Sequence, residues 1–458
     1  MDSKKKKKKN LMALLINPAP LLDSLALANT WDGLDSYPLM PTIPTDLFSG
    51  HTPRLRKVTL ERCQITWPSS LLVNLTHLDI RHLVSQFRPS LSQLVSCLNR
   101  MPVLRRCKLE DALPLLQENV MSGPTVPVEE RVSLLALEFL YLGGTLLECA
   151  QTLAHLHYPK NVILKLSCFA TRADGLDFSP LFPFISHLGR NDIDHSSPSR
   201  VTFRSMFIYP RLFRSGGSYG AVIWFNALEQ RPSSTASAVM IPFEDCGGDD
   251  CNFGLNVSWR TPSSTGPISS ICGVLSLSNI CNLVISGHPD LSEAFWLQTF
   301  HNAQNLKKIT LRESSIQGFV KALARDAPDG YQPGGNTIFL PSLNSIALEF
   351  VKFDETQDTD GSITPVDLRD ALIVRANQGV GIETLAIESC YHLFHDDACL
   401  LEEVVVDFVW DLVEHYDTES DEDDDEDLDS DEDSDEDSDE DGDDDEDDYY
   451  DDHLHVSW

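Results

Sequence analysis

Residues 53–63 read Pro-Arg-Leu-Arg-Lys-Val-Thr-Leu-Glu-Arg-Cys, and this stretch decides the expected fold. Its apolar anchors are Leu55, Val58 and Leu60, with Cys63 three positions further on. The last two anchors are two residues apart, so they lie on one face of a short strand while the residues between them face the other way. One such strand cannot bury its own apolar face, so neighbouring copies must stack to form a shared core.

The same spacing of three apolar anchors recurs at eight other places in the chain. The copies are Leu22, Leu25 and Leu27; Leu75, Leu78 and Ile80; Leu104, Cys107 and Leu109; Leu137, Leu140 and Leu142; Ile280, Leu283 and Ile285; Leu306, Ile309 and Leu311; Leu343, Ile346 and Leu348; and Ile382, Leu385 and Ile387. A single copy can arise by chance in any leucine-rich chain, whereas nine copies with similar flanks indicate the strand half of a leucine-rich repeat. Cysteines follow two copies at 63 and 390, where they fit a core position as small hydrophobic residues.

Between the strand phrases the hydrophobic period changes from two to that of a helix. Residues 90–101 place apolar side chains at i, i+3, i+4 and i+7 from Leu91, which predicts an amphipathic helix. Residues 316–323 and 368–372 carry similar helical companions. Strands alternating with helices predict an α/β leucine-rich-repeat solenoid. In such a horseshoe, parallel strands line the concave face and helices line the convex face.

Composition divides the chain into five parts. Gly, Pro and Ser clusters interrupt the repeat in the middle, where strand-like pieces at 200–209, 221–225, 238–243 and 253–259 predict either an elaborated stretch of the solenoid or an inserted meander. The expected parts are a disordered poly-Lys tail (1–10), a first repeat run (11–170), a β-rich irregular segment or insertion (171–270), a second repeat run (271–415) and a disordered acidic tail (416–458).

Two further stretches are ambiguous as repeat strands. Residues 161–166 carry a degenerate copy, because Asn stands at the first anchor position. Residues 401–413 fit either a helix or a last repeat strand. The β-branched run there favours a strand anchored at Leu401, Val404 and Val406.

The acidic charge of the chain is concentrated at its C-terminal end. The 458 residues carry a net charge of −36, and 27 acidic residues with no Lys or Arg stand between positions 417 and 452, so the remainder carries −9. Such a segment cannot bury enough apolar surface to offset its ordering entropy, which predicts disorder. Four serines have an acidic residue at the third position after them, a context that predicts phosphorylation; they are Ser420, Ser430, Ser434 and Ser438.

Nothing in the sequence indicates secretion or a membrane span. The basic run at residues 4–9 is not followed by a convincing signal peptide, and no stretch reaches the ~18 apolar residues of a transmembrane helix. Eleven cysteines occur without CxxC pairs, as expected for reduced thiols. We therefore expect a cytoplasmic or nuclear protein, and the lysine run is either a solvated tail or a nuclear-import signal.

No catalytic or cofactor-binding motif stands in the chain, so we expect neither an enzyme nor a cofactor. Nucleotide-binding glycine loops, the GxSxG nucleophile motif and the HExxH zinc motif are all missing from the sequence. Residues 246–251 fit a Gly-Asp turn better than a metal loop, and the polar cluster at 392–397 fits the edge of a repeat. Aromatic residues do not interleave with Lys and Arg, which argues against a specific nucleic-acid surface.

The usual working surface of a horseshoe is its concave sheet, and the outward strand positions define it. Their mixture of charge and aromatic character favours a protein partner over a small molecule, although a merely solvated face is the alternative. These positions are Lys57, Thr59, Glu61, His77, Asp79, Arg81, Arg106, Lys108, Glu110, Phe139, Tyr141, Lys308, Thr310, Arg312, Glu349, Thr384 and Glu388.

Residues 17–25 and 51–56, together with the cysteine-bearing repeats, resemble fungal F-box-like leucine-rich-repeat proteins, especially those of mushroom-forming fungi. The resemblance covers roughly residues 11–415. It implies that the repeats hold a substrate while an F-box binds the Skp1-type adaptor of a cullin ubiquitin ligase. No F-box is recognisable here, because the first repeat phrase follows the lysine run closely and Pro18 and Pro20 interrupt the intervening residues. Binding of the adaptor is therefore not expected.

Two functions of different class follow from these features. The first is a non-enzymatic protein-binding scaffold of leucine-rich repeats that resembles the substrate-recognition part of F-box receptors. The second is an acidic-tail protein that shields basic partners such as histones or ribosomal proteins. Loss of the partner on removal of residues 417–458 would indicate the second function.

Overall fold

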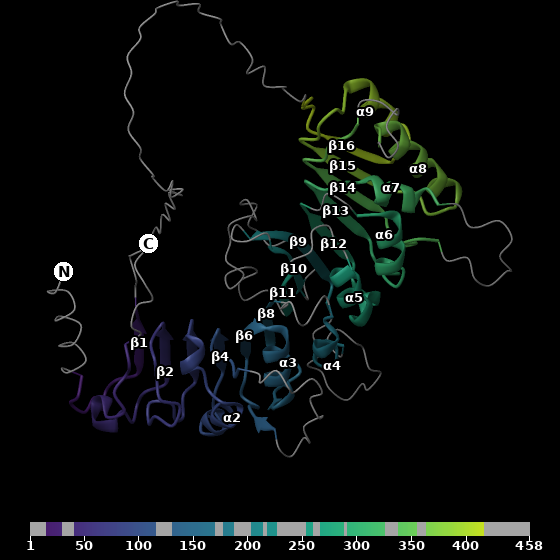
Figure 1. Cartoon of the computed structure of the whole chain (residues 1–458). Helices are drawn as coiled ribbons and strands as arrows, with labels where there is room; N and C mark the ends of the chain where they lie inside the picture. The colour runs from purple at the N-terminus through teal and green to yellow at the C-terminus, as the bar shows by residue number, and fades with distance from the viewer. Residues whose placement is uncertain are drawn as a thin grey trace, which may run out of the picture. The chain divides into compact units, whose positions relative to one another are not determined.

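A computed structural model of the chain describes eleven ranges of residues within one compact unit (Figure 1). The predicted lysine tail, the strand-like piece at 238–243, the turn at 246–251 and the acidic tail with its four serines lie outside these ranges. The described ranges are 15–29, 41–115, 131–169, 177–186, 203–213, 218–226, 253–259, 266–287, 291–325, 338–354 and 363–415.

The fold is mixed α/β and is built on one large, mostly parallel sheet. Its strands follow the order β1-β2-β3-β4-β6-β8-β11-β10-β9-β12-β13-β14-β15-β16, and β5 (Val132–Ser133) and β7 (Leu156–His157) form a separate pair. The strands of the large sheet are β1 (Ser24–Ala28), β2 (Lys57–Glu61), β3 (His77–Arg81), β4 (Arg106–Glu110), β6 (Phe139–Thr145), β8 (Ile163–Phe169), β9 (Ser205–Phe213), β10 (Ser218–Asn226), β11 (Phe253–Trp259), β12 (Asn282–Ser286), β13 (Lys308–Arg312), β14 (Ser345–Glu349), β15 (Thr384–Glu388) and β16 (Asp407–Trp410).

Helices connect many of these strands, and in Figure 1 helices α6 to α9 lie on the same face of the C-terminal strands. The α-helices are α2 (Leu91–Asn99), α3 (Leu146–Ala154), α4 (Phe182–Ile185), α5 (Gly266–Val274), α6 (Glu293–Phe300), α7 (Gln317–Leu323), α8 (Pro365–Asn377) and α9 (His395–Glu402). Short 3-10 helices are η1 (Leu47–Gly50), η2 (Ser85–Phe87), η4 (Ser179–Leu181) and η6 (Leu277–Asn279). The predicted helices at 90–101, 316–323 and 368–372 correspond to α2, α7 and part of α8.

Each of the nine strand phrases forms a strand of the large sheet, as predicted, and so does the degenerate copy, in β8. Their anchors pair in register, so that they form continuous apolar rows across neighbouring strands. One row runs Leu25, Val58, Leu78, Cys107, Leu140 and Leu164. A corresponding row of the second run is Leu283, Ile309, Ile346, Leu385 and Phe408. Most of these side chains are almost fully buried, as are Cys63 and Cys390, which confirms the predicted core positions.

The strands end in a repeated corner. The residue after the strand adopts a left-handed backbone at Arg62, His82, Asp111, Glu313, Phe350 and Ser389, with φ between 48° and 56°. The N–H of this residue commonly donates to the last carbonyl of the next strand, as from Arg62 to Arg81 at 3.0 Å and from Phe350 to Glu388 at 3.0 Å. Non-glycine residues rarely adopt this conformation, so its recurrence indicates a local geometry that the ends of these strands share.

Reciprocal capping boxes fix the starts of three of the described helices. Ser90 caps α2, Thr145 caps α3 and Thr364 caps α8, and in each case the third helical residue completes a reciprocal capping box. Each cap satisfies backbone N–H groups that a helix cannot pair internally and contributes ~0.5–2 kcal/mol. Helix α7 also needs glycine at Gly318, because an added Cβ would lie 1.8 Å from the carbonyl oxygen of Leu291.

The middle of the chain joins the two repeat runs within the same sheet. Strand β11 pairs parallel with β8, β10 pairs antiparallel with both β11 and β9, and β9 pairs parallel with β12. The strand expected at 200–209 is displaced, since β9 spans Ser205–Phe213. The two runs are therefore linked by strands that lack the LxxLxL phrase.

The last strand is present but stands later than predicted. Leu401 belongs to helix α9, where it is fully buried, and β16 places Phe408 beside Leu385 and Trp410 beside Ile387. Val406, predicted as an anchor, is 87% exposed. Both interpretations of the 401–413 segment thus hold in part, because the helical period describes its beginning and a strand describes its end.

Candidate functional site

Alternate strand residues point away from the helices and form what we call the outer face of the sheet. All of the predicted concave-face residues lie on it. Lys57, Arg106, Lys308 and Glu388 are exposed, whereas Thr59, Glu61, His77, Asp79, Arg81, Glu110, Phe139, Arg312, Glu349 and Thr384 are partly buried and Lys108, Tyr141 and Thr310 are buried.

Strand pairing brings the N-terminal members of this set together. Lys57 lies beside His77, His77 beside Arg106 and Arg106 beside Phe139, so the four residues form one row across β2, β3, β4 and β6. Lys308 and Arg312 lie on β13, and β8, β11, β10, β9 and β12 separate them from this row. The structure therefore places the predicted residues in two groups.

Cationic side chains of the outer face pack over aromatic rings. The guanidinium carbon of Arg106 lies 4.7 Å from the centroid of the Phe139 ring, and Lys108 Nζ lies 4.7 Å from that of Tyr141. Lys165 Nζ, on the neighbouring strand β8, lies 5.8 Å from the centroid of the Phe139 ring. Such contacts are worth ~0.5–2 kcal/mol each. Lys165 was missed by the sequence analysis because it lies in the degenerate copy, and its place between Leu164 and Leu166 was the available signal.

Burial removes Tyr141 and Lys108 from the accessible part of the outer face. Tyr141 is only 2% exposed and packs in an apolar cluster with Phe207, Val222 and Val284. Its hydroxyl donates to Glu110 Oε1 at 3.3 Å. Prediction of Tyr141 as an accessible contact is corrected, because strands β9, β10 and β12 bring apolar side chains onto the same face.

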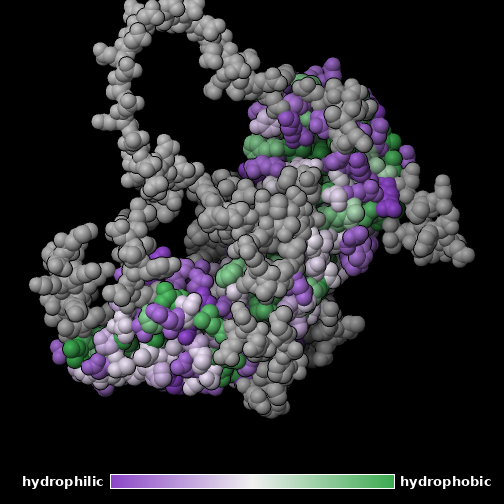
Figure 2. Space-filling model, in the orientation of Figure 1, coloured by the Kyte–Doolittle hydropathy of each residue, from purple (hydrophilic) through white to green (hydrophobic). Residues whose placement is uncertain are grey.

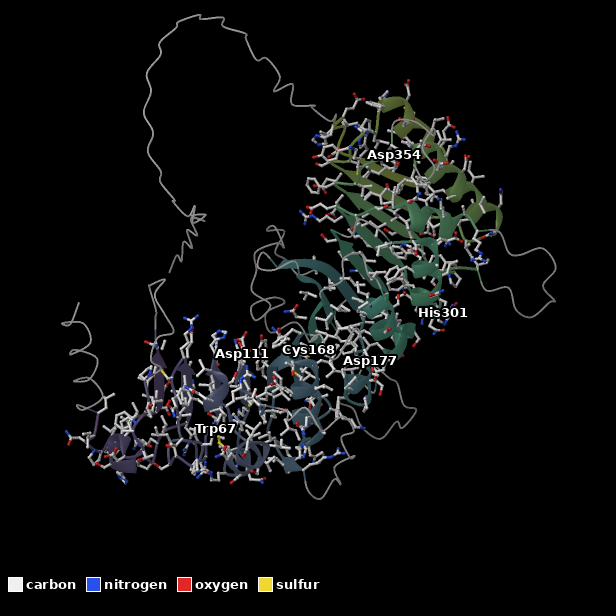
Figure 3. The ribbon with its side chains drawn as sticks, viewed as in Figure 1. Trp67, Asp111, Cys168, Asp177, His301 and Asp354 are labelled. Atoms are coloured by element: carbon white, nitrogen blue, oxygen red, sulfur yellow. The ribbon has the colours of Figure 1, made fainter. Side chains whose placement is uncertain are left out.

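A polar network lies where β3, β4 and β6 end. Arg88 donates to Glu148 Oε1 at 3.1 Å and to Asp111 at 3.5 Å, and Asp111 also contacts His82 Nδ1 at 3.2 Å. Figure 3 shows Asp111 at one end of the strands and Trp67 at the other. The sequence analysis missed the four residues of this network, His82, Arg88, Asp111 and Glu148. Their positions just after strands or in a helix cap were a usable signal.

Glycine at position 144 allows the Glu148 side chain of this network to lie close to the backbone of β6. A Cβ added to Gly144 would lie 2.7 Å from Glu148 Oε2, so glycine allows the carboxylate to approach β6 and accept from the Thr145 N–H at 3.0 Å. Burial raises the pKa of Glu148, and the hydrogen bond from Thr145 and the charge of Arg88 oppose this rise. The network therefore orders the strand ends around a buried acid.

His82 is the residue of this network whose charge changes near neutral pH. Its hydrogen bond to Asp111 raises its pKa above the ordinary value of 6.5, while burial opposes the rise. A raised pKa means that the pair stabilises the fold fully below about pH 6.5 and that this contribution is lost as pH rises through the folded-state pKa.

We expect His82→Asn to destabilise the protein more at pH 5.5 than at pH 8. Asn tolerates the left-handed backbone at this position, so the loss reports the side-chain contact. Because both side chains are 37% exposed, the pH-dependent part should stay below ~1 kcal/mol. Chemical unfolding at both pH values measures it, with exposed His51→Asn as control, and a loss that is the same at both pH values would contradict the expectation.

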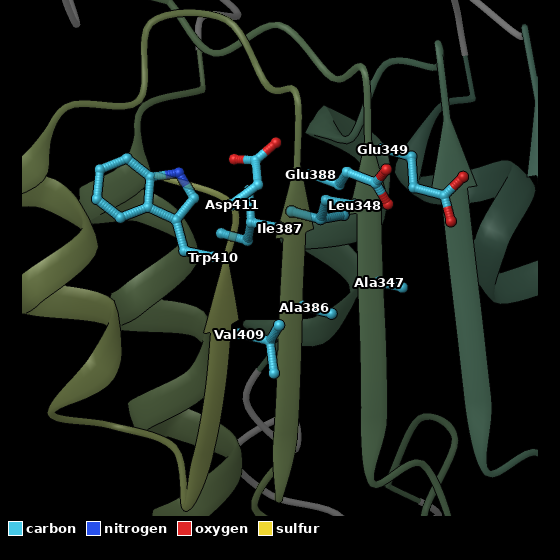
Figure 4. Close-up of a pocket in the computed structure, with 9 residues that line it drawn as sticks. All are labelled: Ala347, Leu348, Glu349, Ala386, Ile387, Glu388, Val409, Trp410 and Asp411. Carbon is cyan, nitrogen blue, oxygen red and sulfur yellow. The ribbon is translucent and has the colours of Figure 1, made fainter. Parts of the chain in front are cut away.

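The C-terminal strands carry a second feature of the outer face. A shallow hollow of about 180 Å³ is floored by Ala347, Ala386 and Val409, one from each of β14, β15 and β16. Figure 4 shows Glu349 and Glu388 above it, in line with Asp411, at the same end of the three strands. Small side chains at the centre and acids at the rim give this region a chemistry unlike that of β2 to β6.

The described residues contain no group of three or more His, Cys, Asp or Glu arranged to hold a metal. Buried His392 contacts the Phe353 carbonyl oxygen through Nδ1 at 3.0 Å, and Asp396 and Asp397 stand in the first turn of α9. Burial raises the pKa of several thiols, such as Cys107 to about 12, so these cysteines are neutral. Within the described ranges, no helix is both long and apolar enough to cross a membrane.

Comparisons with protein-family models, with curated proteins and with solved structures give no match to this chain.

Proposed function

We propose that the chain is a leucine-rich-repeat solenoid that binds a protein on the outer face of its sheet. Three repeated features support the repeat assignment. They are the rows of apolar anchors, the left-handed corner after the strands, and a shared geometry at the start of the strands. There, two successive backbone N–H groups donate to the same carbonyl oxygen. Asn344 supplies that carbonyl to Glu383 and Thr384, and Glu383 supplies it to Val406 and Asp407.

The observation that carries the function is the composition of the outer face on β2, β3, β4 and β6. Exposed Lys57 and Arg106 stand beside partly buried His77 and Phe139 in one row, with Asp79 and Arg81 joined by a charge-assisted contact of 2.6 Å. Arg and aromatic residues are enriched where protein interfaces gain most of their energy. Charges of both signs held on a rigid sheet suit a protein surface better than a small molecule.

The resemblance to fungal F-box-like proteins makes this proposal more specific. We propose that the repeats correspond to the part of an F-box receptor that recognises the substrate of a ubiquitin ligase. No chemical step is assigned to the chain, and binding alone accounts for the proposed role. The partner is defined so far only as a protein with charges of both signs.

Paired charge reversals test the proposal. The double variant Lys57→Glu, Arg106→Glu should lose specific partners in quantitative affinity purification, because attraction at the row becomes repulsion. The matched variant Lys321→Glu, Arg325→Glu makes the same charge change on and just after α7 and should keep those partners. Equal partner lists for the two variants, with unchanged thermal unfolding, would overturn the outer face as the binding surface.

A second function is favoured by the distribution of charge along the chain. No Lys or Arg follows Arg375, and the charged residues on the outer face of β14 to β16 are all acidic. An acidic C-terminal part could shield basic partners such as histones or ribosomal proteins through charge. Removal of residues 417–458 separates the two functions, since the scaffold keeps its partner and the shield loses it. Charge-driven capture should also weaken steeply with salt.

A further inference from the structure

Strand β16 is an edge of the large sheet and pairs only with β15 among the described strands. On its paired side, the N–H groups of Asp407 and Asp411 donate to carbonyls of Glu383 and Ile387. In a parallel strand the intervening residues direct their backbone groups to the opposite side. The N–H and C=O groups of Phe408 and Trp410 therefore face the open edge, which is a template for another strand.

The side chains at this edge are unusually apolar for an exposed position. Val406 is 87% exposed, Val409 is 52% exposed and Leu412 is 74% exposed. Many natural edge strands carry Lys, Pro or a bulge that discourages pairing, and β16 has neither Lys nor Pro. In Figure 2, hydrophobic residues lie beside hydrophilic ones at the end of the molecule that Figure 1 labels β14 to β16.

The charge around β16 decides which strand could add to it. Asp407 lies on the outer face of β16, and Asp411 follows the strand with its carboxylate accepting from the Ser389 N–H at 2.6 Å. Glu388 and Glu349 continue the acidic rim over β15 and β14. A second copy of this edge would place aspartates against the same aspartates. The chain's own residues 417–452 are acidic as well. Like charges disfavour both occupants, whereas Lys and Arg side chains complement the rim.

We propose that β16 binds an extended, basic segment of a partner protein by strand addition. Alternate residues of the added strand would direct Lys or Arg over the outer face, toward Asp411, Glu388 and the hollow. The intervening apolar residues would cover Phe408 and Trp410 on the opposite face. Backbone pairing supplies affinity and the alternating side chains supply selectivity, as in other strand-addition complexes. This surface is separate from the row on β2 to β6, so the inference stands apart from the first proposed function, and it gives the second a defined binding surface.

The test uses the full chain and a capped octapeptide of alternating Lys and Val, with an alternating Glu and Val peptide as control. Hydrogen exchange resolved to single amides reads out the edge directly. The Lys-Val peptide should slow exchange of the Phe408 and Trp410 amides, and the Glu-Val peptide should not. Binding of the Lys-Val peptide without slower exchange at these two amides would overturn the proposal and assign the binding to other acidic residues.

A pair of charge variants then tests the rim. Glu388→Lys should weaken the Lys-Val peptide about fivefold to tenfold, because an exposed attraction becomes a repulsion of similar size. Glu403→Lys makes the same change at an exposed residue just after helix α9 and should leave the affinity nearly unchanged. Equal weakening by both variants would show that only net charge is recognised and would overturn the assigned surface.

Discussion

Replacing Leu60 by Asp should unfold the first run of strands. Leu60 is fully buried and pairs between Leu27 on β1 and Ile80 on β3. The variant loses the packing of a leucine and places an unpaired carboxylate in the core, which together cost more than ~5 kcal/mol. A domain has only ~5–15 kcal/mol of net stability, so the cooperative transition of this run should be lost.

Lys57→Asp is the matched control, because it introduces the same residue at an exposed position of the same strand. Chemical unfolding of this variant should stay within ~0.5 kcal/mol of the original protein. Hydrogen exchange at the β2 and β3 amides locates the damage in Leu60→Asp. If Leu60→Asp unfolded like Lys57→Asp, the assignment of the two faces of the strand would be wrong.

Replacing Arg375 by Met should destabilise the protein by ~2–4 kcal/mol, because the carbonyls it serves would be left buried without their donor. Arg375 on α8 is fully buried and donates to the carbonyl oxygens of Phe339 at 2.7 Å and Leu340 at 3.0 Å. Burial lowers the pKa of its guanidinium to about 10, which still leaves it charged at neutral pH. Arg375 thus ties helix α8 to the turn that precedes β14.

Arg369→Met makes the same substitution on the same helix, where the side chain is partly exposed and contacts Asp370 at the surface. Its effect on the free energy of unfolding should be within ~0.5 kcal/mol. Similar losses for the two variants would contradict the role of Arg375 as a buried donor and would point to helix propensity instead.

The LxxLxL phrase predicted nine strands because each anchor must be buried and the spacing fixes which side chains share a face. The phrase is absent from β9 and β10, which were expected only as strand-like pieces at 200–209 and 221–225. These two strands pair with each other, but β9 also pairs with β12 and β10 with β11, and no sequence pattern predicted those pairings. The sequence analysis also placed the last strand too early in the chain. The β-branched residues at 404–406 suggested a strand there, but burial of Leu401 extends helix α9 to Glu402 and the strand begins at Asp407.

The candidate site was predictable in part for the same reason. Alternation alone assigns Lys57, His77 and Arg106 to the outer face, and their pairing in one row follows from a common register. Burial of Tyr141 was not predictable, because it depends on Phe207 and Val222 from strands that sequence patterns did not align with β6. The sequence patterns therefore could not predict features that depend on pairing between strands distant in the sequence.

Attachment of a photo-crosslinker at single positions tests the central claim most directly. Probes at 57, 77 and 106 report on the outer face, and probes at 92, 321 and 325 report on helix α2 and on and just after helix α7. The account predicts that a partner protein crosslinks repeatedly from the first three positions and rarely from the others. Crosslinks to one partner from the helical positions, with none from the sheet, would contradict the outer face as the binding surface.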